Sequence, residues 1–245
     1  MKLNLIYMVT AATTALTISS CTKKFDPSSY APELSIGGYT SAAEISSENL
    51  VAYWAFDDSL VDSVSNESGT ATGTSFTVSL WTNSPQNTSG IVGLMDVANG
   101  KAFWGNLAIF FENGATPDKG VLKVHVNNNG QDAWLGNYDL TSPWDKWVQI
   151  AVSYDQISST FKVYVNGSRI ATQVIAGFGP LLFQDAQKMV FGTVGFQTSP
   201  SLTTNASKQD WASYMTGRLD QVRIYNKALT DEEISSLQKL EGRGK

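Results

Sequence analysis

Carboxylates and one histidine are the side chains of this 245-residue chain that could carry out acid–base chemistry. Acids are densest at Asp57 and Asp58 and again at residues 231–233. A retaining glycosidase needs two carboxyl groups at a fixed separation in one cleft, and no predicted strand carries acids at alternate positions. A hydrolytic triad would have to use His125, which lies beside Lys123 on the polar face of a predicted strand. We therefore predict that the protein is not an enzyme, with glycoside hydrolysis as the third-ranked function.

Aromatic side chains are the second group with a chemical use, because a flat ring binds the apolar face of a sugar and nearby amides bind its hydroxyl groups. Residues 131–146 and 196–216 are predicted to be long loops. They carry the four candidate carbohydrate-binding residues, which are Trp134, Tyr138, Trp211 and Tyr214. The alternative is that each ring anchors its loop to the body of the fold. The tryptophans of the predicted strands are expected to belong to the core; they are Trp54, Trp81 and Trp147.

The first 20 residues have the pattern of an export signal. Lys2 is followed by an apolar or small stretch that ends in Ser-Ser-Cys21, and Cys21 is the only cysteine. This stretch resembles the signal of bacterial lipoproteins, which implies cleavage before Cys21 and attachment of lipid to it. A plain signal peptide and a short membrane helix are the alternatives, but the stretch is short and Thr-rich for a span. The residues after Cys21 resemble the start of outer-membrane lipoproteins of glycan-utilising bacteria, so we expect a lipid-anchored, surface-exposed location in the outer membrane.

The composition limits the partners of the protein. The chain carries 17 Lys and Arg against 22 Asp and Glu, a formal net charge of −5. A mildly acidic protein binds nucleic acid or anionic lipid poorly, so neither is an expected partner. Contact with the membrane is expected only through the lipid on Cys21.

Short alternating segments separated by turns predict an all-β fold. Asn166-Gly167 predicts a tight hairpin. The segment that starts at Gly217 predicts a closing strand with a slip near Gln221, followed by a short helix. Thr230 and Glu233 have the spacing of a capping box at the start of that helix, and the acids beside them suit its positive end.

Four segments in order resemble laminin-G-like domains of the concanavalin A-like jelly-roll type. They are LVAYWAFD at 50–57, FTVSLW at 76–81, the pair at 147–155 and 161–167, and GRLDQVRIYN followed by ALTDEEI at 217–234. The resemblance implies a two-sheet antiparallel jelly-roll sandwich with a short C-terminal helix. The family pattern has an apolar, Gly-rich segment before the strand at Phe76 that is absent here. This difference predicts that about two strands are missing before residue 76 and raises the question of an open sheet edge.

Calcium binding follows as an expectation from this resemblance. In such jelly rolls the first and last strands run close together, which would bring Asp57 or Asp58 to Asp220. Calcium prefers several oxygen ligands from carboxylates, amides and carbonyl groups. The alternatives are an Asx-turn for Asp57 and Asp58 and a salt bridge from Asp220 to Arg218 or Arg223. We predict a structural Ca²⁺ site formed by Asp57, Asp58 and Asp220.

These features divide the chain into a signal peptide (1–20), a lipid-anchored tether (21–49) and a laminin-G-like sandwich (50–241). Because this fold hosts lectins, adhesion modules and glycosidases, its function has to be argued from the site. The predicted function is that of a non-enzymatic, cell-surface carbohydrate-binding module, with a glycan or polysaccharide as partner. The alternative is a protein–protein interaction or structural module of an outer-membrane assembly. Exposed aromatic rings on one side of the fold would favour the first function, and buried or scattered rings the second.

Overall fold

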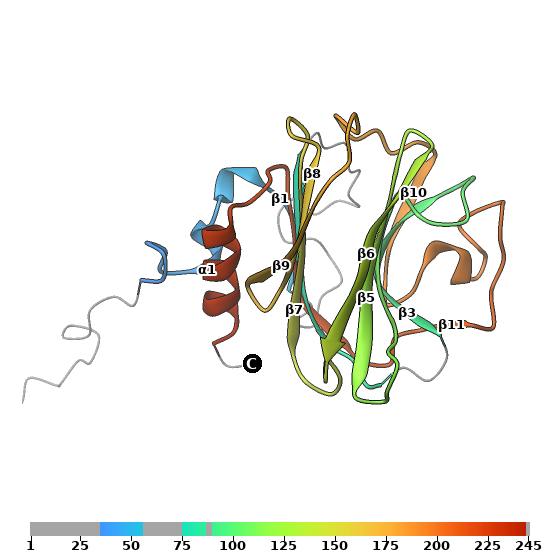
Figure 1. Ribbon diagram of the computed structural model, residues 1–245, viewed down its shortest axis with the longest axis horizontal. Coiled ribbons are helices and arrows are strands. Elements are labelled where there is room, and N and C mark those ends of the chain that lie inside the picture. The colour runs from blue at the N-terminus through green and yellow to red at the C-terminus, as the bar shows by residue number, and fades with distance from the viewer. Residues whose placement is uncertain (1–34, 56–74, 87–89, 244–245) are drawn as a thin grey trace, which may run out of the picture. The chain divides into compact units, whose positions relative to one another are not determined.

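A computed structural model describes residues 35–55, 75–86 and 90–243. The chain divides into two units, residues 1–34 and 35–245, and the described residues all belong to the second. In this unit two sheets, antiparallel except for one short parallel pair, pack face to face, and one helix lies against the outer face of the first sheet (Figure 1). The predicted fold class, a jelly-roll sandwich with a short C-terminal helix, is confirmed. No helix in these residues is long and apolar enough to cross a membrane.

Sheet 1 has six strands in the order β1-β12-β2-β7-β8-β9. Their bounds are Leu50–Trp54 for β1, Arg218–Tyr225 for β12, Phe76–Asn83 for β2, Val148–Asp155 for β7, Thr160–Val165 for β8 and Ser168–Val174 for β9. The first and last strands are neighbours, as expected. Gln221 has a left-handed backbone (φ 49°), and the register of β12 against β2 shifts between Asp220 and Arg223. The slip predicted near Gln221 is therefore a β-bulge.

Sheet 2 has the order β10-β3-β4-β5-β6, and the short strand β11 pairs with β3. The bounds are Ala186–Phe191 for β10, Ile91–Asn99 for β3, Leu107–Asn113 for β4, Lys119–Asn128 for β5, Gln131–Thr141 for β6 and Ala212–Ser213 for β11. The prediction of a long loop over residues 131–146 is wrong, because most of that stretch is β6. Gly136 has φ 66°, and the register between β5 and β6 shifts beside it. This bulge interrupts the alternation by which a strand is predicted.

The core lies between the two sheets. On β2, Phe76, Val78 and Leu80 face this core, as predicted from their alternation. The neighbouring side chains of β2 point to the other side of sheet 1, toward α1. Trp81 is one of them and is only 3% exposed, so it is buried under the helix and not between the sheets.

The helix α1 (Asp231–Glu241) covers the outer face of sheet 1. Thr230 Oγ1 accepts a hydrogen bond from the N–H of Glu233, and the Glu233 carboxylate accepts one from the N–H of Thr230. The predicted capping box is therefore confirmed. The apolar face of the helix packs on sheet 1 in a second hydrophobic cluster, which includes Tyr164, Tyr225, Ile234, Leu237 and Leu240.

Residues 35–49 also pack on α1. They contain two short 3-10 turns, η2 (Ala42–Glu44) and η3 (Ser47–Asn49). Ile45 is buried between them, and Ser46 Oγ donates a hydrogen bond of 2.7 Å to Glu233 Oε1. The described fold therefore begins before residue 50, the boundary expected from the sequence.

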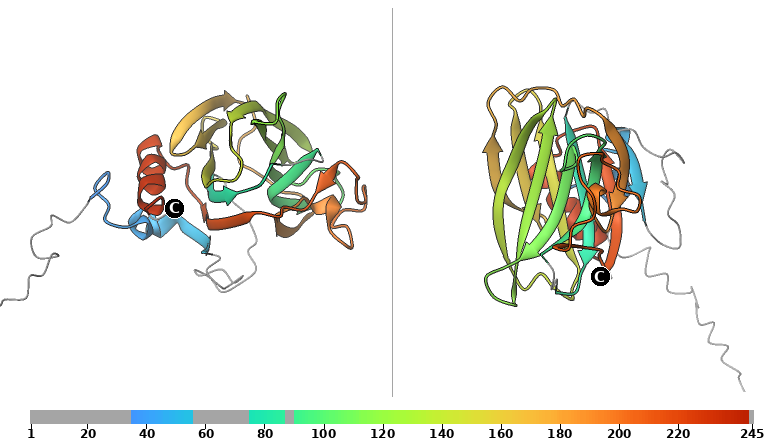
Figure 2. Two further views of the ribbon diagram at one scale, coloured as in Figure 1. Left: turned by 90° about the horizontal axis from the view of Figure 1, so that it is seen from below. Right: turned by 90° about the vertical axis from the view of Figure 1, so that its right-hand side faces the viewer.

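Residues 195–216 lie across the outer face of sheet 2 (Figure 2, right, orange). They start with the turn η4 (Gly195–Gln197) and end beyond β11, which pairs with β3. Each sheet therefore has a covering layer, with α1 on sheet 1 and this segment on part of sheet 2. The uncovered part of sheet 2 is the region of β5 and β6, where Trp134 lies.

Candidate functional site

Six aromatic side chains gather on the outer face of sheet 2, and we name them the outer aromatic cluster. They are Phe103, Trp104, Phe110, Trp134, Phe196 and Trp211. Trp104 lies at the centre. Its ring stacks on Phe110 with the centroids 5.1 Å apart, and it meets the rings of Trp134 at 5.1 Å and Trp211 at 6.2 Å. The fold thus joins two of the predicted site residues through a third tryptophan.

Trp134 is held firmly by this cluster. Its ring stands at 89° to that of Trp104 and at 88° to that of Phe110, and its centroid is 4.7 Å from that of His125. These edge-to-face contacts are the preferred geometry of aromatic pairs. Trp134 nevertheless remains 42% exposed. It therefore offers solvent an apolar surface whose orientation is fixed before any ligand binds.

A pocket of about 370 Å³ opens beside Trp134, and the residues that line it are Lys123, Trp134, Gly136 and Asn137. Lys123 and Asn137 are direct partners in the register of β5 and β6, so their side chains share one face of the sheet. Lys123 Nζ also forms an ion pair of 2.7 Å with Glu112 Oε2 on β4. The pocket therefore has an apolar wall, an amide, and a cation that is partly neutralised.

These groups match the requirements of a sugar ring. The indole of Trp134 can contact the C–H groups of a pyranose, and the amide of Asn137 can both donate and accept hydrogen bonds to hydroxyl groups. The volume lies at the lower end of the range for small-ligand pockets, about 300–1,000 Å³. None of the four lining residues is an acid, so the pocket supplies binding groups and no carboxyl pair for hydrolysis.

His125 lies beneath the cluster and is fully buried. Its Nδ1 lies 3.1 Å from the carbonyl oxygen of Gly105, and its Nε2 lies 3.0 Å from Oδ1 of Asp132. Burial lowers the pKa of His125, while Asp132 and the Gly105 carbonyl partly oppose that effect. The strand face that was predicted to be polar is covered at His125, because the rings of Trp104 and Trp134 pack against it. His125 therefore supports Trp134 from within the fold.

The other predicted aromatic residues have different surroundings. Trp211 belongs to the outer aromatic cluster and is 42% exposed. Tyr214 is 49% exposed, donates a hydrogen bond from its hydroxyl group to the carbonyl oxygen of Gln197, and lies under Lys208 at 5.9 Å. Tyr138 is half-buried and packs against the core. The structure therefore brings Trp134 and Trp211 together and separates Tyr138 from them.

Lys123 and Gly136 are pocket residues that the sequence analysis missed as site residues. Lys123 was placed on the polar face of its strand without a role. One sequence feature could have indicated a bulged strand here: Gly136 stands alone in a stretch that includes Ala133 and Leu135. An isolated glycine in a strand often marks a bulge. Recognising that bulge would have placed Trp134 and Asn137 on a sheet surface.

The predicted calcium and lipid sites fall largely outside the described residues. Asp57, Asp58 and Cys21 are not among them, while Asp220 lies on β12 opposite Trp81 of β2. Within residues 35–55, 75–86 and 90–243, no three His, Cys, Asp or Glu side chains are grouped so as to hold a metal ion. Arg223, one of the alternative partners suggested for Asp220, forms an ion pair with Glu241.

Two antiparallel sheets with aromatic and polar groups on an open face define a jelly-roll sandwich of the lectin-like class. The chain belongs to the concanavalin A-like lectin/glucanase superfamily, whose laminin-G-type family model matches residues 58–235. The resemblance stated from the sequence motifs is therefore confirmed. A comparison with curated protein sequences finds no match.

Solved structures with the same fold include modules of sialidases. The CBM40 module of the Ruminococcus gnavus IT-sialidase, bound to α2,3-sialyllactose, is 15% identical with a TM-score of 0.50; the match covers 68% of this chain and 83% of that chain. A mutant NanB sialidase from Streptococcus pneumoniae is 19% identical with a TM-score of 0.53. The match covers 76% of this chain and 27% of the NanB chain. This chain thus spans about a quarter of NanB. At these identities the likeness shows the fold alone.

Proposed function

We propose that the protein is a non-enzymatic carbohydrate-binding module and that its site is the pocket beside Trp134. The observation that carries the proposal is the state of Trp134, which is exposed to solvent and yet fixed by edge-to-face contacts with Trp104 and Phe110. A rigid exposed indole loses little conformational entropy when a ligand covers it. Asn137 and Lys123 stand beside it to bind hydroxyl groups.

The lectin-like fold supports this proposal, as does the sialyllactose bound by the CBM40 module. We propose that the ligand of this chain is also a glycan, although the two chains share few residues. Binding without hydrolysis is favoured because the lining of the pocket contains no acid, and because the nearby carboxylate of Glu112 is held by Lys123 at 2.7 Å.

The cellular setting of the proposal comes from the sequence. Lipid on Cys21 would anchor the protein in the outer membrane and leave the sandwich free to bind polysaccharide at the cell surface. Cys21→Ser tests this step. We expect the parent protein, with lipid on Cys21, to appear in membrane fractions and the Cys21→Ser protein to be lost from them. Equal membrane retention of both proteins would contradict the lipid anchor.

A glycan array followed by titration calorimetry tests the binding function. We expect the parent protein to bind at least one oligosaccharide and Trp134→Ala to weaken that binding by about tenfold or more, since stacking and burial on one indole contribute about 1.5–3 kcal/mol. Asn137→Ala should weaken it less. Tyr214→Ala is the matched control, because Tyr214 is a similarly exposed aromatic residue outside the pocket. An empty array, or equal affinity of the parent and Trp134→Ala, would overturn the proposal and favour a protein-interaction module.

A further inference from the structure

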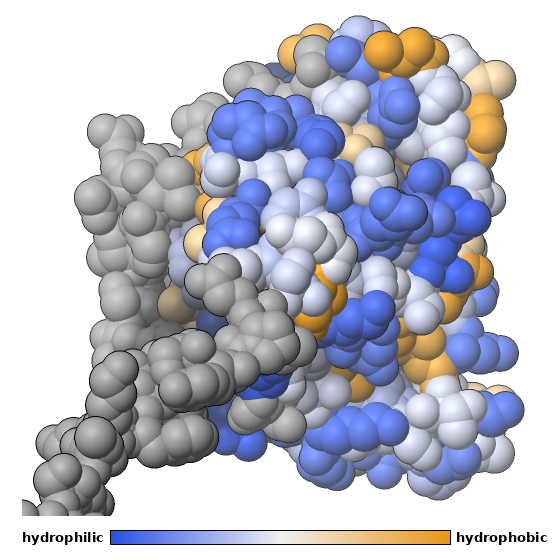
Figure 3. Space-filling view, turned by 90° about the vertical axis from the view of Figure 1, so that its left-hand side faces the viewer, coloured by the Kyte–Doolittle hydropathy of each residue, from blue (hydrophilic) through white to orange (hydrophobic). Residues whose placement is uncertain are grey.

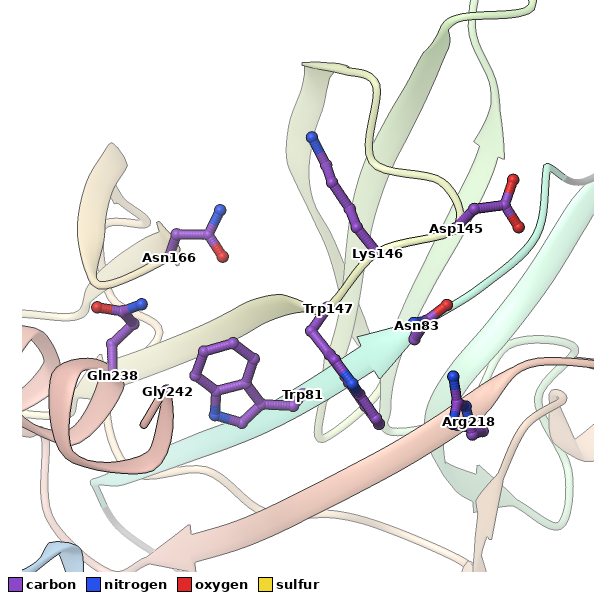
Figure 4. Close-up of a pocket in the computed structure, with 9 residues that line it drawn as sticks. All are labelled: Trp81, Asn83, Asp145, Lys146, Trp147, Asn166, Arg218, Gln238 and Gly242. Carbon is purple, nitrogen blue, oxygen red and sulfur yellow. The ribbon is translucent and has the colours of Figure 1, made fainter. Parts of the chain in front are cut away.

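A larger pocket lies on the opposite side of the sandwich, where the C-terminal end of α1 meets sheet 1 (Figure 4). Its volume is about 660 Å³. It is lined by side chains from the ends of β2 and β12, from the turn before β7, from the β8–β9 hairpin and from the last turn of α1. It shares no residue with the pocket beside Trp134.

Trp81 forms the floor of this pocket, and its position is fixed by buried polar groups. Its Nε1 donates a hydrogen bond of 2.7 Å to Oε2 of Glu241, and Oε1 of Glu241 lies 2.6 Å from Nε of Arg223. Gly242 follows at the end of the helix. A Cβ atom at that position would lie 3.3 Å from the edge of the Trp81 ring, so the glycine lets the helix end pack closely on this largely buried ring.

Arg218 and Lys146 are the cations in the lining of the pocket, and the side chain of Lys146 extends away from Trp147 and Arg218 (Figure 4). The guanidinium group of Arg218 lies over the ring of Trp147, 5.5 Å from its centroid. Neither Arg218 nor Lys146 forms an ion pair with any described residue. Asp145 is the acid in the lining, and its carboxylate points away from the ring of Trp147 (Figure 4). Within the described part of the chain, the charges of Arg218 and Lys146 are therefore not neutralised by an ion pair.

Three amide side chains complete the lining. Asn166 and Gln238 lie on the helix side of the pocket, and Asn83 lies near Trp147 (Figure 4). Asn166 is oriented by a hydrogen bond of 2.9 Å that its Oδ1 accepts from the N–H of Gln149. The side chains of Asn83 and Gln238 make no hydrogen bond with other described residues, so their donors and acceptors are available to a ligand. Hydroxyl groups of a saccharide would satisfy them.

The surface on the α1 side does not suggest a protein partner. Its described residues are largely hydrophilic, and hydrophobic residues appear there in small separate spots (Figure 3). Stable protein interfaces have a more apolar centre than this. A polar ligand with one anionic group fits the lining better.

We propose that this pocket is a second binding site, selective for an acidic saccharide. Arg218 would bind the carboxylate or sulfate group, with its planar guanidinium offering two parallel N–H donors. Lys146 would add charge, Trp147 an apolar contact, and the amides of Asn83 and Gln238 hydrogen bonds to hydroxyl groups. The site does not depend on the function proposed for Trp134, because the two pockets lie on different sheets and have no residue in common.

Titration calorimetry of the full chain with three oligosaccharides of equal length tests this site. The ligands are an oligogalacturonate, a sulfated oligogalactan and a neutral oligogalactan. We expect at least one acidic ligand to bind more tightly than the neutral one, and its affinity to fall as salt rises. Arg218→Gln should weaken that binding by about tenfold, the cost of losing a charge-assisted hydrogen bond. Preference for the carboxylated or the sulfated ligand identifies the anionic group.

Lys188→Gln is the matched control, because it removes one exposed positive charge on β10 of sheet 2, outside this pocket. Trp134→Ala shows which pocket takes the acidic ligand, because it removes the apolar wall of the first pocket and changes no residue of the second. Equal affinity for neutral and acidic ligands, or equal losses in Arg218→Gln and Lys188→Gln, would overturn the second site. Loss of acidic-ligand binding in Trp134→Ala with none in Arg218→Gln would assign the acidic ligand to the first pocket instead. Arg218 is exposed, so the melting midpoint of Arg218→Gln should match that of the parent.

Discussion

Arg223 on the last strand and Glu241 in the last turn of α1 form a buried ion pair, with Nε of Arg223 2.6 Å from Oε1 of Glu241. Both side chains are at most 5% exposed. Burial raises the pKa of Glu241, and the charge of Arg223 offsets part of that effect. The pair joins the end of the helix to the sheet it covers, and through Trp81 it also fixes the floor of the second pocket.

Loss of this ion pair should destabilise the protein strongly. Glu241→Gln leaves the charge of Arg223 buried without a counter-charge, and we expect the free energy of unfolding to fall by about 3–5 kcal/mol. Urea unfolding at neutral pH measures this value. Glu232→Gln, an exposed position in the first turn of the same helix, is the control and should stay within about 0.5 kcal/mol of the parent. Similar losses in the two variants would show that the pair does not hold the helix.

Asp96 should make stability depend on pH. Its carboxyl group is fully buried on the outer side of β3, and burial raises its pKa from 3.8 to about 7, although the N–H of Gly195 donates a hydrogen bond to it. The folded state therefore favours the protonated acid. This contribution is fully present below about pH 4 and is lost as the pH rises through about 7. The difference between 3.8 and about 7 corresponds to about 4 kcal/mol.

The Asp96→Asn variant isolates the contribution of Asp96 to the pH dependence of stability from the contributions of all other titrating groups. The amide carries no charge at any pH, so the stability of the variant relative to the parent should increase between pH 4 and pH 7 and then level off. Urea unfolding of both proteins across this range gives the difference directly. A constant difference would mean that Asp96 is ionised in the folded protein throughout.

Trp104 should affect glycan binding without touching the ligand, because it positions Trp134 and does not line the pocket. We expect Trp104→Ala to weaken glycan binding by about three- to tenfold, in line with about 0.5–1.5 kcal/mol for an aromatic contact. Trp104→Phe keeps a ring against Phe110 and should recover most of the affinity. If Trp104→Ala bound as tightly as the parent, the rigidity of Trp134 would not matter for binding.

Calcium binding at Asp57, Asp58 and Asp220 stays a prediction from the sequence. The neighbouring positions of β1 and β12 agree with its premise that the first and last strands lie side by side. Thermal melting with EDTA and with excess calcium tests it. We expect a higher midpoint with calcium, because a ligand that binds only the folded state stabilises it. Asp220→Asn should remove this difference in melting midpoint. Equal midpoints of the parent protein with EDTA and with calcium would contradict the prediction.

Local sequence signals predicted parts of the fold accurately. The capping box of Thr230 and Glu233 depends on residues three positions apart, and the bulge at Gln221 interrupts a clear alternation. Strand β6 was not predicted, because the bulge at Gly136 interrupts the alternation of apolar and polar residues. The position of Trp134 on a sheet was therefore not predicted either. Tyr138 was assigned to the same predicted loop, and in the structure its ring is partly buried against the core.

The second pocket could not be predicted from the sequence. Trp81 and Trp147 were expected in the core because each lies in or beside a strand. Only the packing of α1 on sheet 1 shows that both rings lie on the side of the sheet away from the core. Arg218 looked like a partner for Asp220. Its position over Trp147 depends on contacts between segments more than 70 residues apart in the chain, and such contacts leave no local pattern.

The place of β12 between β1 and β2 has a consequence for how the protein is made. In the described fold β1 pairs with β12 alone. During synthesis β1 therefore has no strand to pair with until β12 has been made. Until then β2 also lacks one neighbour, and the apolar side of both strands is exposed. Contacts between such distant segments form slowly, because a long loop has to close first. The sandwich is therefore completed only when β12 has been synthesised, and until then the apolar faces of β1 and β2 favour aggregation of the unfinished fold.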